Sequence, residues 1–359
     1  MTITLHPITQ LKGHTAPVLC AKYAKDTILG DHVLASGSED NTCRIWDLRS
    51  QRVVKGIKGL HNPVSSVEFA PVPESSLLYL SSGTKVFTYD IRNTSMILSE
   101  ATREYDFSSD EINSIDVNGK HTYLATADDN GEVKIIDLAT HTIFKKMTKK
   151  HGNLCMSVKF SQRMTWEVWS GGLDCKIYRW DYSRGKPLDI INTTSSEPSA
   201  SQMFNPPFVY TLGSSLDGNW IAAGLGDASI QLFNFGDKKK KKQQLDTNPR
   251  EIRLENGHTN MVNCLSFLPL LDGNNTFAHL LSGSVNGSLA LWRLPHHLDD
   301  VTDHHHQLQE TLEKYQLDDS IARLNHLESY SLDGTSTQLA VAGVGTQCNL
   351  GVLNLYSLL

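Results

Sequence analysis

A strand, a tight polar turn and a second strand that closes on Trp-Asp can be read in Ser36-Gly37-Ser38-Glu39-Asp40-Asn41-Thr42-Cys43-Arg44-Ile45-Trp46-Asp47-Leu48-Arg49. Asp, Asn and Ser in the turn favour it because their side chains hydrogen-bond the local backbone. Degenerate copies of the stretch recur along the chain. A repeat of this kind has to be recognised before any single element is predicted.

Six weaker copies follow the first one. The fourth is the most complete, with His151, a strand up to Gly171, Asp174 and Trp180. The sixth has Gly257-His258, a turn at Asn286 and Trp292. The remaining copies lack some of these residues, and their third strands are expected at Thr84 to Asp90, Val133 to Asp137, Ile230 to Phe233 and Val352 to Tyr356.

Composition limits the class of protein. The chain has 359 residues, a formal net charge of -6 and 39% hydrophobic residues. This mildly acidic balance gives no argument for nucleic-acid binding. No apolar run approaches the ~18–20 residues that cross a bilayer, and residues 1–10 do not resemble a signal peptide. We therefore expect a soluble intracellular protein of the cytoplasm, the nucleus or both.

The six cysteines are scattered and form no CxxC pair. This spacing indicates small buried hydrophobes in a reducing compartment rather than a disulfide or zinc framework. The sequence also has no HExxH, no GxxxxGK[ST] and no GxSxG elbow between a strand and a helix. We therefore predict no catalytic residues, no cofactor, no metal site and no enzyme activity.

The recurring Gly-His and Trp-Asp positions resemble the WD-repeat family, whose repeats span ~40–45 residues. The resemblance implies an all-β fold: a single seven-bladed WD40 β-propeller over residues 1–359. The alternation of apolar and polar residues also fits a β-sandwich, but the repeated positions favour the propeller. Residues 3–11 alternate before the first Gly-His. We expect this N-terminal strand to close the last blade and leave no free edge.

In WD repeats a His, a Ser or Thr, the turn Asp and the Trp form a hydrogen-bonded tetrad. The resemblance assigns this structural role to His14, Ser36, Asp40 and Trp46. A half-buried carboxylate needs donors and a buried indole N–H needs an acceptor, so such a tetrad would tie two strands to their turn. The fourth and sixth copies should supply further members at His151, Asp174, Trp180, His258 and Trp292.

Three stretches interrupt the repeats, and the first, residues 192–206, is rich in Ser and Thr and should be a surface loop or the outer strand of the fourth blade with an insertion. Residues 236–250 form a lysine-rich surface loop around Lys238 to Lys242, which is a nuclear import signal, a contact for an anion or simply a solvated loop. We expect residues 295–320 to form a His-rich loop insertion that is either ordered or partly disordered. A short helical pattern runs from Leu308 to Leu317. Its histidines resemble no catalytic zinc pattern.

The first two copies share an ending, Trp46-Asp47-Leu48-Arg49 and Tyr89-Asp90-Ile91-Arg92. An Asp at the end of the third strand and an Arg two residues later place both side chains at one rim of the disc. Arg49 and Arg92 would then lie side by side, and their planar guanidinium groups suit carboxylates and carbonyls. An Asp–Arg ion pair that only stabilises the turn is the simpler interpretation. The fourth copy carries Arg184 one residue out of register.

This ending resembles the motif of WD-repeat substrate receptors of cullin-4 RING ubiquitin ligases. In that family the Arg docks onto the propeller-built adaptor known as the damaged-DNA-binding protein large subunit. The resemblance implies adaptor contacts at Asp47, Arg49, Asp90 and Arg92.

Most blades also resemble, in the same order, one branch of the WD-repeat family that is assigned to these receptors and whose targets are poorly defined. The stretches Glu111 to Ile115 and Leu124 to Leu138 carry this likeness, and the loop insertions depart from it. The branch implies an adaptor and an unknown protein target as partners, without direct nucleic-acid or membrane contact, and a monomer outside such complexes. A scaffold or chromatin-peptide reader without a ligase link is the alternative, and a propeller hydrolase is a weaker one.

Overall fold

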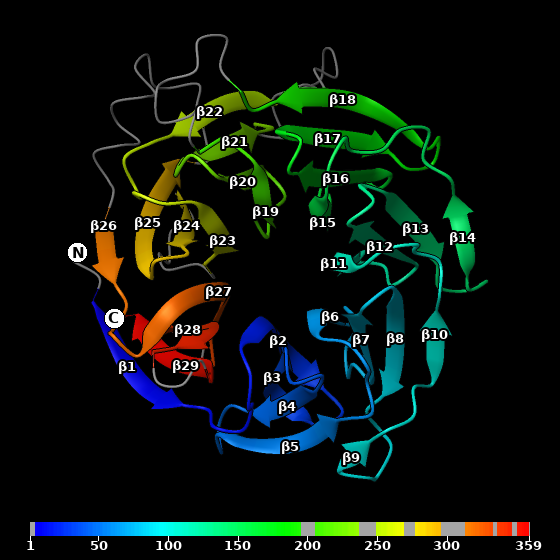
Figure 1. Ribbon diagram of the computed structural model, residues 1–359, viewed down its shortest axis with the longest axis vertical. Coiled ribbons are helices and arrows are strands. Elements are labelled where there is room, and N and C mark those ends of the chain that lie inside the picture. The colour runs from blue at the N-terminus through cyan, green and yellow to red at the C-terminus, as the bar shows by residue number, and fades with distance from the viewer. Residues whose placement is uncertain are drawn as a thin grey trace.

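The computed structural model describes residues 4–194, 205–236, 249–268, 277–295, 313–332, 336–346 and 350–358. Within these ranges, 29 strands form seven sheets that stand like blades around a central channel (Figure 1). The described ranges contain no helix, and therefore none that could span a lipid bilayer. The predicted all-β fold with seven blades is confirmed.

Each of the first four blades begins with its innermost strand at the channel. Blade 1 consists of β2 (Val18–Thr27), β3 (Gly30–Ser38), β4 (Cys43–Asp47) and β5 (Arg52–Ile57), with β9 (Ile97–Leu98) added at its outer edge. Blade 2 consists of β6 (Val64–Phe69), β7 (Leu77–Ser82), β8 (Lys85–Asp90) and β10 (Arg103–Tyr105). Blade 3 consists of β11 (Ile112–Val117), β12 (Tyr123–Asp128), β13 (Val133–Asp137) and β14 (Thr142–Lys145). Blade 4 consists of β15 (Cys155–Phe160), β16 (Glu167–Gly172), β17 (Lys176–Asp181) and β18 (Lys186–Asn192).

The last three blades complete the ring. Blade 5 consists of β19 (Val209–Ser214), β20 (Trp220–Leu225), β21 (Ile230–Asn234) and β22 (Arg250–Leu254). Blade 6 consists of β23 (Val262–Phe267), β24 (Phe277–Ser284), β25 (Ser288–Pro295) and β26 (Glu313–Gln316). Blade 7 consists of β27 (Ile321–Tyr330), β28 (Thr337–Gly345), β29 (Gly351–Leu358) and β1 (Leu5–Gln10).

The N-terminal strand closes the ring as predicted. β1 pairs antiparallel with β29, with Leu5 opposite Leu358 and Gln10 opposite Asn354. Figure 1 shows the blue N-terminal strand outside the red C-terminal strands. The two ends of the chain therefore share one sheet, which leaves no open edge at the seam of the ring.

The apolar core lies between neighbouring sheets. One cluster joins Val33 and Ile45 of blade 1 to Val64 and Leu78 of blade 2, and all four side chains are fully buried. Trp46, Trp180 and Trp292 are likewise buried. Because each blade buries its faces only against the next blades, the repeats are stable as a ring and position their turns on its two faces.

Six turns that lead into a third strand contain one residue in the left-handed backbone region: Asn41, Gly83, Gly131, Cys175, Ala228 and Gly287. Glycine adopts this region without strain, and Asn tolerates it better than other residues do. The repeated turn thus explains the Asn or Gly in four of these blades and identifies Ala228 and Cys175 as strained exceptions.

The expected helical pattern from Leu308 to Leu317 is wrong where it can be compared. Glu313–Gln316 forms β26, which pairs with β25 from Ser288 to Leu291. Blade 6 needs an outer strand, and the hydrogen bonds to β25 override the local helical spacing. The histidines at 296, 297 and 304–306 and the lysines at 238–242 lie outside the described residues.

Candidate functional site

The first tetrad is assembled as a continuous chain of hydrogen bonds. His14 Nδ1 lies 2.9 Å from Asp40 Oδ2, and His14 Nε2 lies 2.8 Å from Ser36 Oγ. The Trp46 indole N–H donates to the same Ser36 oxygen at 2.8 Å. Because a carboxylate only accepts, His14 donates from Nδ1 and accepts the Ser36 hydroxyl proton at Nε2.

The electrostatics of this tetrad keep Asp40 ionised. Partial burial raises the pKa of the Asp40 carboxyl, but hydrogen bonds from His14 and Thr42 outweigh it, so the pKa lies well below its usual value. The contacts from Ser36 to His14 to Asp40 copy those of a hydrolase triad. Ser36 is 0% exposed, however, and its oxygen already accepts the Trp46 N–H, so this serine is structural.

The tetrad recurs in blade 4. His151 lies 2.9 Å from Asp174 and 2.8 Å from Ser170, and Trp180 donates to Ser170 at 2.8 Å. In the second copy, by contrast, His61 is exposed in the turn before β6. A histidine before the innermost strand of a repeat therefore does not by itself indicate a tetrad.

Blade 6 keeps three of the four tetrad groups. His258 Nε2 lies 2.7 Å from Ser282, and Trp292 donates to Ser282 at 2.8 Å. Ser288 takes the place of the turn Asp, 2.9 Å from His258 Nδ1. Burial, and then the charge of Lys314, lower the pKa of His258 to about 4, so this imidazole is neutral at pH 7.

In the third and fifth blades, a Lys or an Arg rather than a histidine binds the carboxylate in or beside the turn between the second and third strands. Asp128 pairs with Lys134 at 2.7 Å, and Asp227 pairs with Arg253. Sequence reasoning missed both cations, although Lys134 follows its turn directly.

The turn after β4 presents Arg49. The Asp47 carboxylate accepts the Arg49 backbone N–H at 3.0 Å and the Ser50 hydroxyl at 2.6 Å. Burial raises the pKa of Asp47, but the lowering by these hydrogen bonds is larger, so the pKa lies below its usual value. Asp47 therefore shapes the turn, while the exposed Arg49 side chain has no carboxylate within 4.0 Å in the described part of the chain.

The turn after β8 presents Arg92 in a different way. The Asp90 carboxylate accepts the Arg92 backbone N–H at 2.9 Å and also hydrogen bonds from two guanidinium nitrogens, Nε at 3.0 and 3.1 Å and Nη2 at 2.6 Å. The Arg92 side chain remains 64% exposed. The ion pair considered from the sequence is thus present at Arg92 and not at Arg49.

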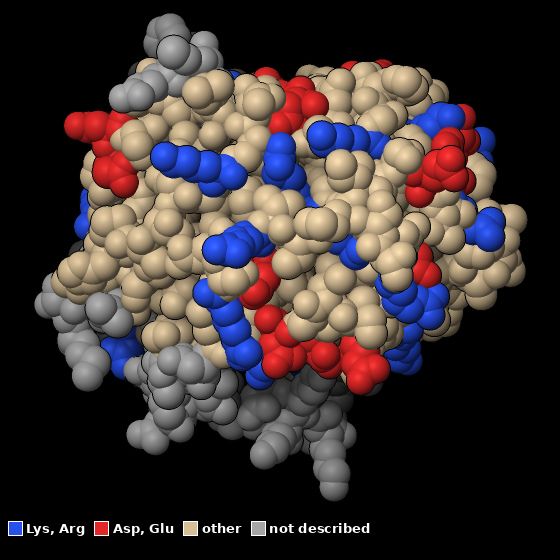
Figure 2. Space-filling model, turned by 90° about the horizontal axis from the view of Figure 1, so that it is seen from below, with Lys and Arg blue, Asp and Glu red and all other residues tan. Residues whose placement is uncertain are grey.

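Both arginines lie on the same face of the ring. β4 and β8 are the third strands of neighbouring blades, and all blades have the same strand order from the channel outward. Their ends, and the turns that follow them, therefore share one face. Seen from below Figure 1, the edge of the disc near β5 and β9 carries Lys and Arg side chains with acidic side chains among them (Figure 2).

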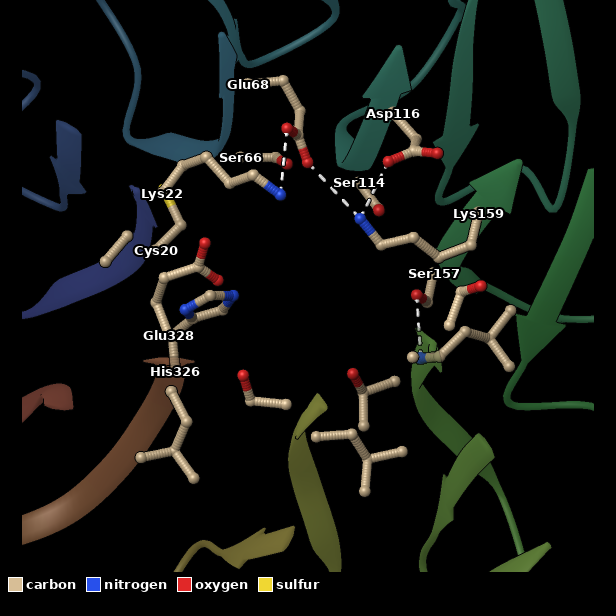
Figure 3. Close-up of a pocket in the computed structure, with 18 of the residues that line it drawn as sticks. Cys20, Lys22, Ser66, Glu68, Ser114, Asp116, Ser157, Lys159, His326 and Glu328 are labelled. Carbon is tan, nitrogen blue, oxygen red and sulfur yellow. Dashed lines mark hydrogen bonds and ion pairs between the residues drawn. The ribbon is translucent and has the colours of Figure 1, made fainter. Parts of the chain in front are cut away.

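The central channel forms a cavity of about 970 Å³ lined by the seven innermost strands. The fifth residue of β2, β6, β11 and β15 is charged in each case: Lys22, Glu68, Asp116 and Lys159. Figure 3 shows these side chains pointing into the channel, together with Glu328 of β27. These charged residues were not predicted from the sequence, although a charged side chain at the same position of four inner strands was visible there.

Ion pairs connect the charged residues into one arc. Lys22 Nζ lies 3.2 Å from Glu68, and Lys159 Nζ lies 3.3 Å from Glu68 and 2.8 Å from Asp116. Glu328 accepts the Tyr23 backbone N–H at 3.1 Å, which links blade 7 to blade 1. The arc therefore holds the inner strands of neighbouring blades together.

Burial and pairing act in opposite directions on these groups. Burial lowers the pKa of Lys22 and Lys159, but the nearby carboxylates raise it more, so both remain protonated. Burial raises the pKa of Asp116 and prevails over Lys159. For His326, burial and repulsion from the two lysines lower the pKa to about 4. At pH 7 the channel thus carries a mixed charge and a neutral imidazole.

The fold and its matched repeats define the class of this protein. Residues 5–47, 100–137 and 250–293 match the family model of the WD domain, G-beta repeat. Together with the seven sheets, these matches show a seven-bladed β-propeller that contains WD40 repeats.

Among curated proteins, the chain is similar to the WD repeat-containing protein 53 homolog of Dictyostelium discoideum, with 27% identity over 304 residues, 79% of this chain and 77% of that protein. It is also 24% identical over 287 residues to the human kinesin-like protein KIF21B, covering 75% of this chain and 16% of that protein. The guanine nucleotide-binding protein subunit beta of Nicotiana plumbaginifolia is 24% identical over 240 residues, 64% of this chain and 60% of that protein.

Proposed function

We propose that this propeller is a non-catalytic docking protein and, more specifically, a substrate receptor of a cullin-4 RING ubiquitin ligase. One observation carries the proposal. Two aromatic-Asp-x-Arg turns in neighbouring blades present exposed arginines, Arg49 and Arg92, on one face of the disc.

The local contacts suit these arginines to a partner. Asp47 is engaged by the backbone and by Ser50, so the Arg49 guanidinium is available to another carboxylate or carbonyl. Asp90 aligns the Arg92 guanidinium without burying it. Arginines that lose their water in an interface often contribute a large share of the binding energy. The partner surface should therefore offer carboxylates or free carbonyls.

The partner that the resemblance suggests is the propeller-built adaptor of this ligase class. The protein target would contact the opposite face or the channel mouth, where loops of all blades converge on a rigid scaffold. We further propose a monomer outside such complexes, in the cytoplasm, the nucleus or both, with no direct contact to nucleic acid or membrane.

A WD-repeat scaffold without a ligase link would use the same fold and need neither arginine. A chromatin-peptide reader would need an acidic, aromatic-lined pocket for a basic tail. The channel instead places Lys22 and Lys159 at the level of its carboxylates, which gives less support to that alternative.

Gel filtration of the purified chain with the purified adaptor tests the proposal. The wild type should elute with the adaptor, and the Arg49→Ala/Arg92→Ala variant should not. Arg184→Ala is the matched control, because Arg184 lies in the corresponding turn of blade 4 and also pairs with its turn Asp at 3.4 Å. Separate elution of the wild type and the adaptor contradicts the ligase assignment and leaves the scaffold.

A further inference from the structure

A buried lysine of blade 1 holds the turn that carries Arg92 in blade 2. Lys55 on β5 is 6% exposed. Its ammonium group donates to the main-chain carbonyl of Asn93 and, at 2.9 Å, to that of Ser95. Both carbonyls follow Arg92 within three residues, so Lys55 grips the Arg92 turn by its backbone.

The chain beyond this turn continues along blade 1 as a strap, residues 93–98. The Gly56 N–H donates to the Met96 carbonyl at 2.9 Å, and the Lys58 N–H donates to the Leu98 carbonyl at 3.0 Å. β9 thereby pairs parallel with β5, outside it in Figure 1. Leu98 is 4% exposed and packs in the core shared by blades 1 and 2.

The strap attaches Arg92 to the blade that carries Arg49. Arg92 ends a strand of blade 2, but the residues after it are bonded to β5, three residues beyond Arg49. Without the strap, the spacing of the two arginines would depend only on how the two blades pack. With it, the Arg92 turn moves with blade 1.

Burying a lysine at this position costs free energy that a residue needed only for packing would not cost. A buried ammonium group loses its water, and the loss is offset only by hydrogen bonds to the two carbonyls. No carboxylate lies within ion-pair distance of Lys55 in the part of the chain that the structure describes. An apolar side chain of similar length would fill the space without this cost but would remove the donor to the Asn93 and Ser95 carbonyls.

We propose that Lys55 is a positioning residue that fixes Arg92 relative to Arg49, so that both guanidinium groups meet one partner surface. This inference rests on the proposed function, because the partner surface is that of the adaptor. It also goes beyond the aromatic-Asp-x-Arg pattern, since Lys55 lies outside both motifs.

A double-mutant cycle tests the inference with the full chain and the purified adaptor. Lys55→Met should raise the Kd for the adaptor about tenfold in the wild-type background and less than twofold in the Arg92→Ala background, because interacting residues are not additive. Lys58→Met, which removes an exposed lysine of the same segment, should leave the Kd unchanged. An equal loss in both backgrounds, or no loss, overturns the positioning role.

Hydrogen exchange on the isolated chain separates this inference from the proposed function. In Lys55→Met, the amides of Gly56 and Lys58 should exchange about tenfold faster, because both donate to the strap. If the exchange rates do not change, Lys55 does not stabilise the strap, and this conclusion does not depend on whether the adaptor binds. If the wild type does not bind the adaptor, the proposed function fails, and the role of Lys55 in docking fails with it.

Discussion

Lys159 on β15 forms an ion pair with Glu68 on β6 at 3.3 Å, although blade 3 separates their two blades. Asp116 of that intervening blade contributes the second contact of Lys159, at 2.8 Å. One ammonium group therefore joins three blades inside the channel. The charge arc thus stabilises the ring from within the channel, while Arg49 and Arg92 lie on one face of the ring.

Lys159→Met should lower the free energy of unfolding by about 2–4 kcal/mol. Removing one partner of a buried pair typically costs ~3–5 kcal/mol, and the 25% exposure of the Lys159 side chain reduces this. Chemical denaturation measures the change. Lys25→Met is the control, because Lys25 is an exposed lysine that lines the same cavity. A Lys159 variant as stable as this control would contradict the role of the arc.

Stability should fall as the pH drops from about 6.5 to about 4. The pKa of His258 and that of His326 are lowered to about 4, below the ordinary value of 6.5, so the unfolded chain binds protons first. The stabilisation is thus complete above pH 6.5 and is lost as the pH falls through 4, on the order of 1–3 kcal/mol per histidine.

Denaturation at pH 7 and pH 5 measures this dependence. His326→Gln keeps a neutral polar side chain beside Lys22 and Lys159 but cannot titrate, so it should lose less stability between the two pH values than the wild type. Equal losses would mean that His326 is not the titrating group.

Asp40→Ala should destabilise the protein by about 1–3 kcal/mol, because His14 and the Thr15 N–H lose their acceptor. Differential scanning calorimetry should show a lower Tm. Glu39→Ala, in the same turn but 41% exposed, should change the Tm little. A similar effect of both substitutions would show that the tetrad contributes no more than a surface charge.

Ala228→Gly should stabilise the protein by about 0.5–1 kcal/mol. Ala228 has a φ of 69°, a conformation that costs a residue with a Cβ about 1–2 kcal/mol, and the greater freedom of glycine in the unfolded chain offsets part of the gain. Ala222→Gly in the adjacent β20 should be destabilising instead, because Ala222 is fully buried in a regular strand. A loss of stability in Ala228→Gly would show that the turn relaxes without strain.

The repeat made the fold predictable, since the copies of Ser36 to Arg49 placed most strands, and residues 3–11 indicated how the ring closes. One element was predicted wrongly for a physical reason. The sequence of β26 has a helical spacing, but its partner strand β25 rather than its own sequence determines its conformation.

The arginines of the candidate docking face were visible in the sequence as a motif, but their contacts were not. Nothing in the local pattern distinguishes Asp90, which pairs with its Arg, from Asp47, which binds Ser50. Lys55 was not foreseen because its acceptors are backbone carbonyls about 40 residues later, and carbonyls carry no sequence signature.

The dissociation constant of the purified chain and the purified adaptor, measured by isothermal titration calorimetry, tests the central claim most directly. For the wild type we expect saturable one-to-one binding, and for Arg49→Ala/Arg92→Ala a Kd at least about 100-fold higher with a Tm within about 1 °C of the wild type. Equal affinity of the folded double variant, or no binding of the wild type, would contradict the account.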